Sequence, residues 1–203
     1  LRFDEDGLKE VYSKFFNTLK NTYNFFALYA NTDHLDPREF TVSKEELEEI
    51  DLWMLSRYHH LVQNVTTYYD EYDLTKVVHA ITDFVNEDLS NWYIRRNRRR
   101  FWASELDASK KAVYKTTYDV LVGISKMIAP IVPFVSEEIY CNLTEEESVH
   151  LAYFPKADET YFNDILENKM EMVRTLISLG RNVREEVRIK VRQPIQEVIL
   201  DYK

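Results

Sequence analysis

Turn-forming residues are scarce in this sequence. Its 203 residues include only 3 glycines and 5 prolines. An all-β fold needs many tight turns, and glycine and proline form a large share of them. The scarcity argues against an all-β fold and favours long helices.

Cysteine is nearly absent, and long apolar runs are missing. The single cysteine, Cys141, cannot form a disulfide within the chain, which is typical of a protein from the reducing cytosol. No apolar run approaches the roughly 18 residues needed to cross a bilayer. The first residues, LRFDEDGLKE, contain neither an initiator methionine nor a basic-then-apolar signal segment. We therefore expect a cytoplasmic chain without a membrane partner, cut from a longer protein.

Positive charge is in deficit. The 26 lysines and arginines are outnumbered by 35 aspartates and glutamates, which leaves a formal net charge of −9. Such a surface repels phosphate and argues against indiscriminate nucleic-acid binding. Contact with nucleic acid would have to come from a local basic patch. The 45% hydrophobic content is enough to build a core.

Apolar residues recur at intervals of three and four in six segments, the spacing of amphipathic helices. Ser43 and Glu46 have the spacing of a capping box before the second segment, Asp73 can cap the third, and Pro130 stops the fourth. The expected helices cover approximately residues 8–30, 47–65, 74–100, 104–128, 136–143 and 164–187.

The last residues have a different pattern. The stretch RIKVRQPIQEVIL alternates and is rich in β-branched residues, which predicts a strand after the last helix. Gly180 lies near the inward face of that helix, where the missing side chain would let a neighbour approach closely. We predict a mainly α fold: an antiparallel helical bundle over residues 1–148, followed over residues 149–203 by a small, truncated α/β appendage.

The segment NWYIRRNRRRFW, residues 91–102, concentrates positive charge between aromatic residues. At about 100° per residue, Arg95, Arg96 and Arg99 continue the apolar stripe of Ile81, which predicts a helix that projects from the bundle with a cationic tip. Guanidinium groups donate paired hydrogen bonds to phosphate, and tryptophan offers a face to unstacked bases. The candidate RNA-contacting residues are Trp92, Arg95, Arg96, Arg98, Arg99, Arg100 and Trp102.

The alternative for this segment is a structural one. The arginines could pair with nearby acids such as Glu87, Asp88, Glu137 and Glu138, and the tryptophans could belong to the core. Five arginines with no acid among them exceed what local pairing ordinarily requires, so the composition favours contact with nucleic acid.

A second basic cluster lies near the end of the chain. Arg181, Arg184 and Arg188 are at helical spacing, and Lys190 and Arg192 would share one face of the expected strand. Glu185 and Glu186 could neutralise part of this cluster. We expect the five basic residues to form a second contact with RNA.

No group of residues has the pattern of a catalytic or metal site. The pair His59-His60 has no cysteine or aspartate at ligand spacing, Cys141 lies in no reactive motif, and the glycines do not form a phosphate-binding loop. We expect no catalytic residue, no metal ligand and no cofactor within this chain.

Several stretches resemble isoleucyl-tRNA synthetases of class I. DFVNEDLSNWYIRRNRRRFW, ISKMIAPIVPFVSEEIY, SVHLAYFP and KVRQPI are similar to the region that follows the catalytic core. DLWMLSRYHHLV resembles a segment shared by class I synthetases for branched aliphatic amino acids, and LRFDEDGLKEVYSKFFNTLKNTYNFF resembles the preceding linker and helix. The resemblance covers essentially the whole chain, and the valyl and leucyl relatives lack this arginine-rich ending.

The resemblance implies an anticodon-binding bundle and the beginning of a C-terminal subdomain. Its partners would be the anticodon arm of isoleucine tRNA and the catalytic domain of the same parent chain. The family's adenylation signatures and editing insert are absent here, so ATP, Mg²⁺ and the ligation of isoleucine to tRNA would belong to the parent enzyme. Three alternatives stay open: a structural bundle that docks on the catalytic domain, the equivalent domain of a valyl or leucyl relative, and a free-standing helical adaptor.

Overall fold

The computed structural model describes residues 4–199 and confirms a mainly α fold. The chain divides into two compact units, one ending at Asn163 and one beginning at Asp164. Each unit is described by itself. None of the helices within residues 4–199 is long and apolar enough to cross a membrane.

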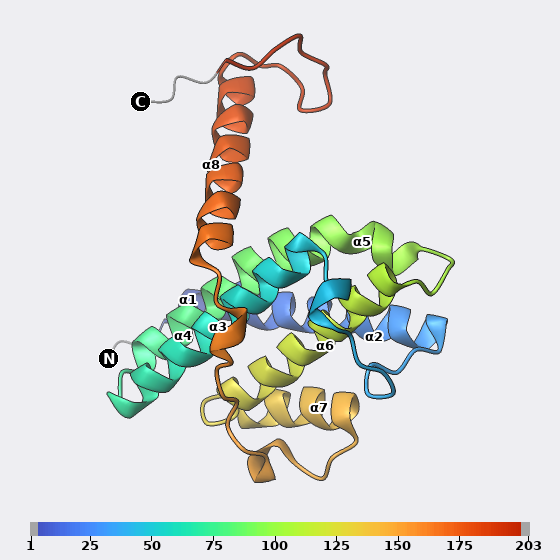
Figure 1. Ribbon diagram of the computed structural model, residues 1–203. Helices are drawn as coiled ribbons and strands as arrows, with labels where there is room; N and C mark the ends of the chain where they lie inside the picture. Colours follow the sequence, from blue (N-terminus) through green and yellow to red (C-terminus); the bar gives the residue numbers. More distant parts are fainter. Residues whose placement is uncertain (1–3, 200–203) are drawn as a thin grey trace. The chain divides into compact units, whose positions relative to one another are not determined.

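The first unit is a helical bundle (Figure 1). Two of its helical segments contain π-helical stretches between α-helices and continue through them without a break. Its elements are α1 (Glu5–Val11), η1 (Tyr12–Phe16), α2 (Asn17–Asp33), η2 (Lys44–Glu46), α3 (Glu49–Asp70), α4 (Leu74–Asp83), η3 (Phe84–Ile94), α5 (Arg95–Trp102), α6 (Ala108–Ile128), α7 (Pro133–Thr144), η4 (Val149–Leu151) and η5 (Glu159–Tyr161).

Capping residues set where the helices begin. The Asp73 carboxylate accepts a hydrogen bond from the backbone amide of Lys76 at 3.0 Å, which confirms the expected cap of α4. Ser43 and Glu46 do form a capping box, but it caps only the short 3₁₀ turn η2. Because Leu47 is extended, the backbone leaves the helical conformation there, and α3 begins only after a second capping box formed by Glu48 and Asp51.

Helices α3 and α6 pack against each other, and each has fully buried apolar side chains, among them Trp53 and Val62 on α3 and Leu121 and Ile124 on α6. Their close approach depends on Gly123 of α6. A Cβ atom added there would lie 1.9 Å from the hydroxyl oxygen of Tyr58, whose side chain is buried on α3. The absence of a side chain at position 123 therefore makes room for an aromatic ring of the neighbouring helix.

The segment that follows α7 packs on the bundle. The ring of His60 stacks on Phe162 with centroids 4.0 Å apart, and His59 stacks on Tyr161 at 5.0 Å. The Phe154 ring packs edge-on against Tyr69. These aromatic contacts extend the first unit to Asn163, beyond the boundary expected at residue 148.

The second unit consists of α8 (Asp164–Glu186) and a series of turns. The expected strand is wrong: no strand is present among the described residues up to Ile199. Arg188 ends the helical segment with a left-handed φ of 57°, and the Arg184 guanidinium donates to the carbonyls of Lys190 and Gln193, each at 2.9 Å. These bonds hold the segment as turns, and an isolated strand would have no edge to pair with.

The expected inward face of α8 is also wrong. Most of its apolar residues are exposed, and no atom lies within 4 Å of the position that a Cβ of Gly180 would occupy. The apolar spacing predicts an inward face of Ile165, Met172, Val173, Leu176, Val183 and Val187; all of these are exposed except Leu176, which is half-buried.

We predict that Gly123→Ala destabilises the chain. The new methyl group would overlap the Tyr58 ring, and overpacking of this kind costs about 1–3 kcal/mol in the free energy of unfolding. Gly180→Ala is the control, because it meets open space inside a helix and should be neutral or stabilising by up to ~1 kcal/mol. Urea denaturation of both variants measures the difference. Equal stabilities of the two variants would show that Tyr58 moves aside freely.

Candidate nucleic-acid interface

The arginine-rich helix α5 lies along the bundle and packs on α6 (Figure 1). Its faces differ sharply in burial. Asn97 and Phe101 are buried on the side toward the core, with side chains 3% and 1% exposed. The opposite side is exposed and is called the arginine arc below. The residues of the arginine arc, within about 100° of Arg95 on the helix, are Arg95, Arg96, Arg98, Arg99 and Trp102.

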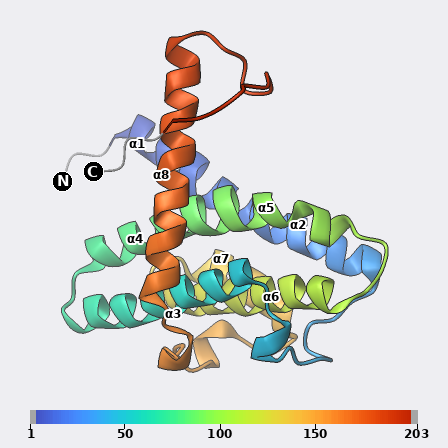
Figure 2. The same cartoon turned by 45° about the horizontal axis from the view of Figure 1, so that its top comes forward.

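The expected projecting tip is therefore wrong, and the π-helical segment explains why. Helices α4 and α5 are joined by η3, which has 11 residues (Figure 2). A π-helix has i→i+5 hydrogen bonds and more residues per turn, so each residue advances by less than the 100° of an α-helix. Over η3 the difference adds up to roughly half a turn. The positions that a plain α-helix would place on the stripe of Ile81 consequently face solvent.

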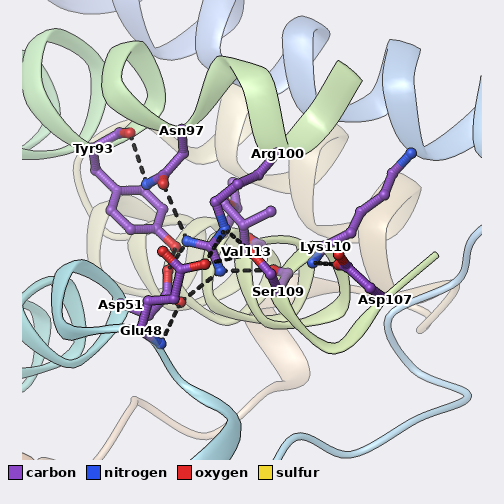
Figure 3. Close-up of polar contacts among 10 residues, drawn as sticks. Glu48, Asp51, Tyr93, Asn97, Arg100, Asp107, Ser109, Lys110 and Val113 are labelled. Atoms are coloured by element: carbon purple, nitrogen blue, oxygen red, sulfur yellow. Dashed lines mark hydrogen bonds and ion pairs between the residues drawn. The ribbon is translucent and has the colours of Figure 1, made fainter. Parts of the chain in front are cut away.

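Arg100 is the exception among the five arginines, and its expected role as an RNA contact is corrected. Its side chain is 12% exposed and points into the bundle, toward Asp51 at the start of α3 (Figure 3). Its Nη1 donates to Asp51 Oδ1 at 2.8 Å, and its Nη2 donates to Oδ2 at 2.7 Å. Asp51 itself has no exposed surface. Arg100 is thus neutralised by a carboxylate of the same chain and lies outside the arginine arc.

Polar groups from η3, α5 and α6 surround this ion pair (Figure 3). The Tyr93 hydroxyl donates to Asp51 Oδ1 at 2.5 Å, and Arg100 Nη1 also donates to Asn97 Oδ1 at 3.1 Å. On α6, Ser109 accepts from Arg100 through its hydroxyl at 2.9 Å and through its carbonyl at 2.6 Å. Burial disfavours the charge on Arg100, but the bonds to Asp51 outweigh burial and raise its pKa.

The phenol of Tyr93 is buried next to the same Asp51 carboxylate and stays protonated. Burial and the neighbouring Asp51 charge raise its pKa far above the ordinary value of a tyrosine. The hydroxyl is therefore available as a hydrogen-bond donor to the carboxylate. Tyr93 and Arg100 both donate hydrogen bonds to Asp51, and the two carboxylate oxygens accept them.

A second buried cation holds the end of α5. The Lys110 side chain is 3% exposed; its ammonium group donates to the Ala103 carbonyl at 2.5 Å and pairs with Asp33 at 2.8 Å. The Tyr114 hydroxyl donates to the same carboxylate at 2.5 Å. Burial favours the neutral acid, but the Lys110 and Tyr114 bonds outweigh it and lower the pKa of Asp33. The loop after α5 is thereby tied to α2 and α6.

The remaining arginines are free for a partner. Among residues 4–199 no carboxylate pairs with Arg95, Arg98 or Arg99. Two of the four acids that the structural alternative proposed have other contacts: Asp88 pairs with Arg57 at 2.9 Å, and Glu137 accepts the backbone amide of Val149 at 2.8 Å. Uncompensated guanidinium groups on an acidic chain form a local attraction for phosphate.

The two tryptophans of the segment differ. Trp92 is half-buried, and the Arg96 guanidinium lies over its ring at 4.3 Å from the centroid. Trp102 is 54% exposed and lies one helical turn beyond Arg98 and Arg99. Trp102 therefore offers an aromatic face within the arginine arc, whereas Trp92 supports Arg96.

The second basic cluster belongs to the second unit. Arg181, Arg188, Lys190 and Arg192 are exposed there, whereas Arg184 is half-buried and bonded to two carbonyls. Without a strand, Lys190 and Arg192 do not share a strand face. The cluster surrounds an open cavity of about 490 Å³, whose lining includes Arg181, Arg184, Glu185, Arg188 and Lys190.

The other candidate residues have structural contacts. His59 accepts the backbone amide of Asp158 at 3.2 Å, and burial lowers its pKa. Among residues 4–199 no three histidine, cysteine, aspartate or glutamate side chains are grouped as metal ligands. Cys141 packs against a small buried cluster that includes Ala129, Tyr140 and Val149, and burial raises the pKa of its thiol.

Sequence reasoning did not identify Asp51, Ser109 or Lys110 as important residues. One signal was available for Asp51, because it interrupts the apolar spacing of Leu47, Ile50 and Met54 at a position that must face the core. A carboxylate at such a position is costly unless a cation or hydrogen-bond donors surround it. The sequence offers five arginines between residues 95 and 100 as possible partners, and it does not reveal which of them pairs with Asp51.

A family model described as the anticodon-binding domain of tRNA ligase matches residues 51–200. Isoleucine–tRNA ligases are similar over 98% of this chain: 45% identity for the enzyme of Bacteroides thetaiotaomicron and 44% for that of Porphyromonas gingivalis. The isoleucine–tRNA ligase 2 of Bacillus cereus is 45% identical over the same share. The chain spans only 18% to 19% of the length of these relatives.

We predict that Arg100→Met destabilises the chain strongly. The substitution leaves the buried Asp51 carboxylate without its counter-ion, and breaking a buried pair in this way costs about 3–5 kcal/mol. Arg99→Met is the matched control, because Arg99 is exposed and unpaired in the described chain, and its loss should change stability by less than ~0.5 kcal/mol. Chemical denaturation compares the two. Similar stabilities would mean that Asp51 finds another partner.

Proposed function

The chain belongs to the family of anticodon-binding domains of tRNA ligases, and we propose that it binds the anticodon arm of isoleucine tRNA as part of an isoleucine–tRNA ligase. The observation that carries the proposal is the arginine arc on α5, which faces solvent without carboxylate partners in the described chain. The family match spans the whole of α5, and relatives named as isoleucine–tRNA ligases are similar along 98% of the chain.

The chemistry of the arc suits a folded RNA loop. Arg95, Arg98 and Arg99 present planar forks that donate paired hydrogen bonds to phosphate oxygens. Trp102 can stack on an unpaired base, a contact that tolerates any base because every base has a π face. Arg96, held over Trp92, is presented in a fixed position at the edge of the arc. The net charge of −9 keeps the rest of the chain from binding RNA indiscriminately.

The second unit would add another contact. Arg181, Arg188, Lys190 and Arg192 are exposed and suit the phosphates of the same RNA. Arg184 instead supports this cluster, because its guanidinium holds the turn that carries Lys190. The acidic Glu185 beside them limits the attraction to phosphate.

The parent enzyme would supply the chemistry. ATP, Mg²⁺ and isoleucine would bind to a catalytic domain elsewhere in the parent chain, where isoleucine is activated and transferred to tRNA. No residue of this chain would take part in that reaction. The competing proposal is that the arginine arc docks on acids of the catalytic domain; in that case variants of the arc would leave the binding of RNA unchanged.

We predict that Arg99→Glu weakens the binding of a synthetic anticodon stem-loop of isoleucine tRNA to this chain. Removal of one phosphate contact should lower the slope of log K against log salt by about one. The affinity should fall by about tenfold or more, because a hydrogen bond to a charged group is worth roughly 1.5–3 kcal/mol. Fluorescence anisotropy at several salt concentrations measures both quantities.

The control for this experiment is Lys156→Glu. Lys156 is exposed in the segment after η4, and the substitution changes the net charge by the same amount. It should weaken binding little and leave the salt slope unchanged, since it is not part of the arc. Arg99 would be removed from the site if both variants bound like the original chain.

We predict that Trp102→Ala lowers the affinity for the same stem-loop without changing stability. Stacking of one base on an aromatic ring contributes about 1–3 kcal/mol, so a loss of roughly tenfold is expected. Trp102→Phe should retain much of the affinity, because it keeps an aromatic face. Titrations with the stem-loop and with a duplex that lacks unpaired bases separate stacking from charge: only the stem-loop should distinguish the Ala variant from the original chain.

A further inference from the structure

We infer that the buried pair of Asp51 and Arg100 positions the arginine arc by fixing the rotation of α5 about its axis. The inference rests on the proposed function, since it concerns how the same surface is presented to RNA. Asp51 and Arg100 are positioning residues here and do not touch the ligand. Arg100 has a side chain 12% exposed, and Asp51 has none of its side chain exposed.

The geometry of the pair sets an orientation as well as a distance. Both guanidinium Nη atoms bond to separate oxygens of one carboxylate, at 2.8 and 2.7 Å. A planar fork on a planar carboxylate allows one arrangement, whereas a single bond would let either group turn. The Arg100 side chain is bonded further to Asn97 within α5 and to Ser109 on α6. The rotation of α5 is thus fixed relative to both α3 and α6.

A competing rotation of α5 is available to this sequence. If residues 84–94 formed an α-helix, the arc would turn by roughly half a turn, and Arg95, Arg96 and Arg99 would follow the buried stripe of Ile81. A π-helix is the rarer conformation, so contacts at its ends must hold it. Arg100 follows η3 in the chain, whereas Ile81 precedes it. With α5 turned by half a turn, Arg100 would point away from Asp51 and lose its bonds to that carboxylate.

Apolar packing alone discriminates less well between such rotations. Phe101 contacts Phe25 and Tyr114 at 5.1 and 4.9 Å between centroids, but an apolar surface accepts many orientations of a ring. Replacement of a buried ion pair by apolar residues is often neutral or stabilising, whereas a buried polar group can specify one register among several. The pair therefore contributes more to specifying one rotation than to net stability.

The decisive variant is the double substitution Asp51→Asn with Arg100→Met. It removes both charges together, so neither is left buried and unpaired, and the chain should keep a melting temperature close to that of the original. Without the fork, α5 should populate other rotations. We expect the affinity for a synthetic anticodon stem-loop of isoleucine tRNA to fall by about tenfold or more, with a smaller salt slope because fewer arginines reach phosphate.

A matched control exists in the loop after α2. Arg38 and Asp36 form a more exposed bidentate pair, with Nε on Oδ1 and Nη2 on Oδ2, far from α5 in sequence and outside the arc; Arg38 also pairs with Glu145 at 3.0 Å. The double variant Asp36→Asn with Arg38→Met removes the same charges and leaves the net charge unchanged. It should bind the stem-loop like the original chain. A general loss of affinity in both double variants would overturn the inference, because the effect would then not be specific to α5.

The remaining outcomes are distinguishable. If the double variant at positions 51 and 100 folds and binds with the original affinity and salt slope, the pair has no positioning role. If that double variant does not fold, the single variant Arg100→Lys is measured instead, because lysine keeps the positive charge but cannot form the two-bond fork. An unchanged salt slope for Arg100→Lys overturns the inference, and a reduced salt slope supports it. If the original chain does not bind the stem-loop, or if Arg99→Glu binds as well as the original, the proposed function itself fails and the inference falls with it.

Discussion

The Asp51 carboxylate has no contact with solvent, and three parts of the bundle depend on it. One oxygen accepts the backbone amide of Glu48 at 3.0 Å and so closes the capping box that starts α3. The other accepts the Tyr93 hydroxyl of η3, and both accept the fork of Arg100 on α5. Taking a carboxylate out of water costs several kcal/mol unless such bonds replace its hydration. The start of α3, the π-helical segment and the arginine helix therefore satisfy the same buried charge.

The arginines of residues 95–100 serve two different purposes in this arrangement. Arg100 is half-buried, and Asp51 cancels its charge. Arg95, Arg98 and Arg99 keep theirs on the surface. Lys110 repeats the pattern at the end of α5, where it pairs with Asp33 inside the bundle. Arg100 and Lys110 tie α5 and the loop after it to neighbouring helices. The exposed arginines of the arc remain available to a partner, so α5 is structural on one face and open to solvent on the other.

The sequence predicted the helices well, because their boundaries depend on local features. Apolar spacing located the helices, and Asp73 caps α4 as expected. The strand prediction failed because alternation in a short segment gives no information about a partner strand, and here Arg184 holds the backbone in turns. The faces of α5 could not be predicted by counting at 100° per residue. A small error in the turn of each residue accumulates over the 11 residues of η3 until inside and outside are exchanged.

The buried acid could have corrected that error. Asp51 lies on the core face of α3, and a carboxylate there is costly unless a cation or hydrogen-bond donors surround it. The arginine-rich segment is the densest source of cations, and in the folded chain Arg100 of this segment supplies the partner. Which member turns inward depends on the phase of η3, and this phase is set by contacts that only the folded bundle contains. The buried charge of Asp51 is thus met by the arginine that the phase of η3 turns toward it, which is Arg100.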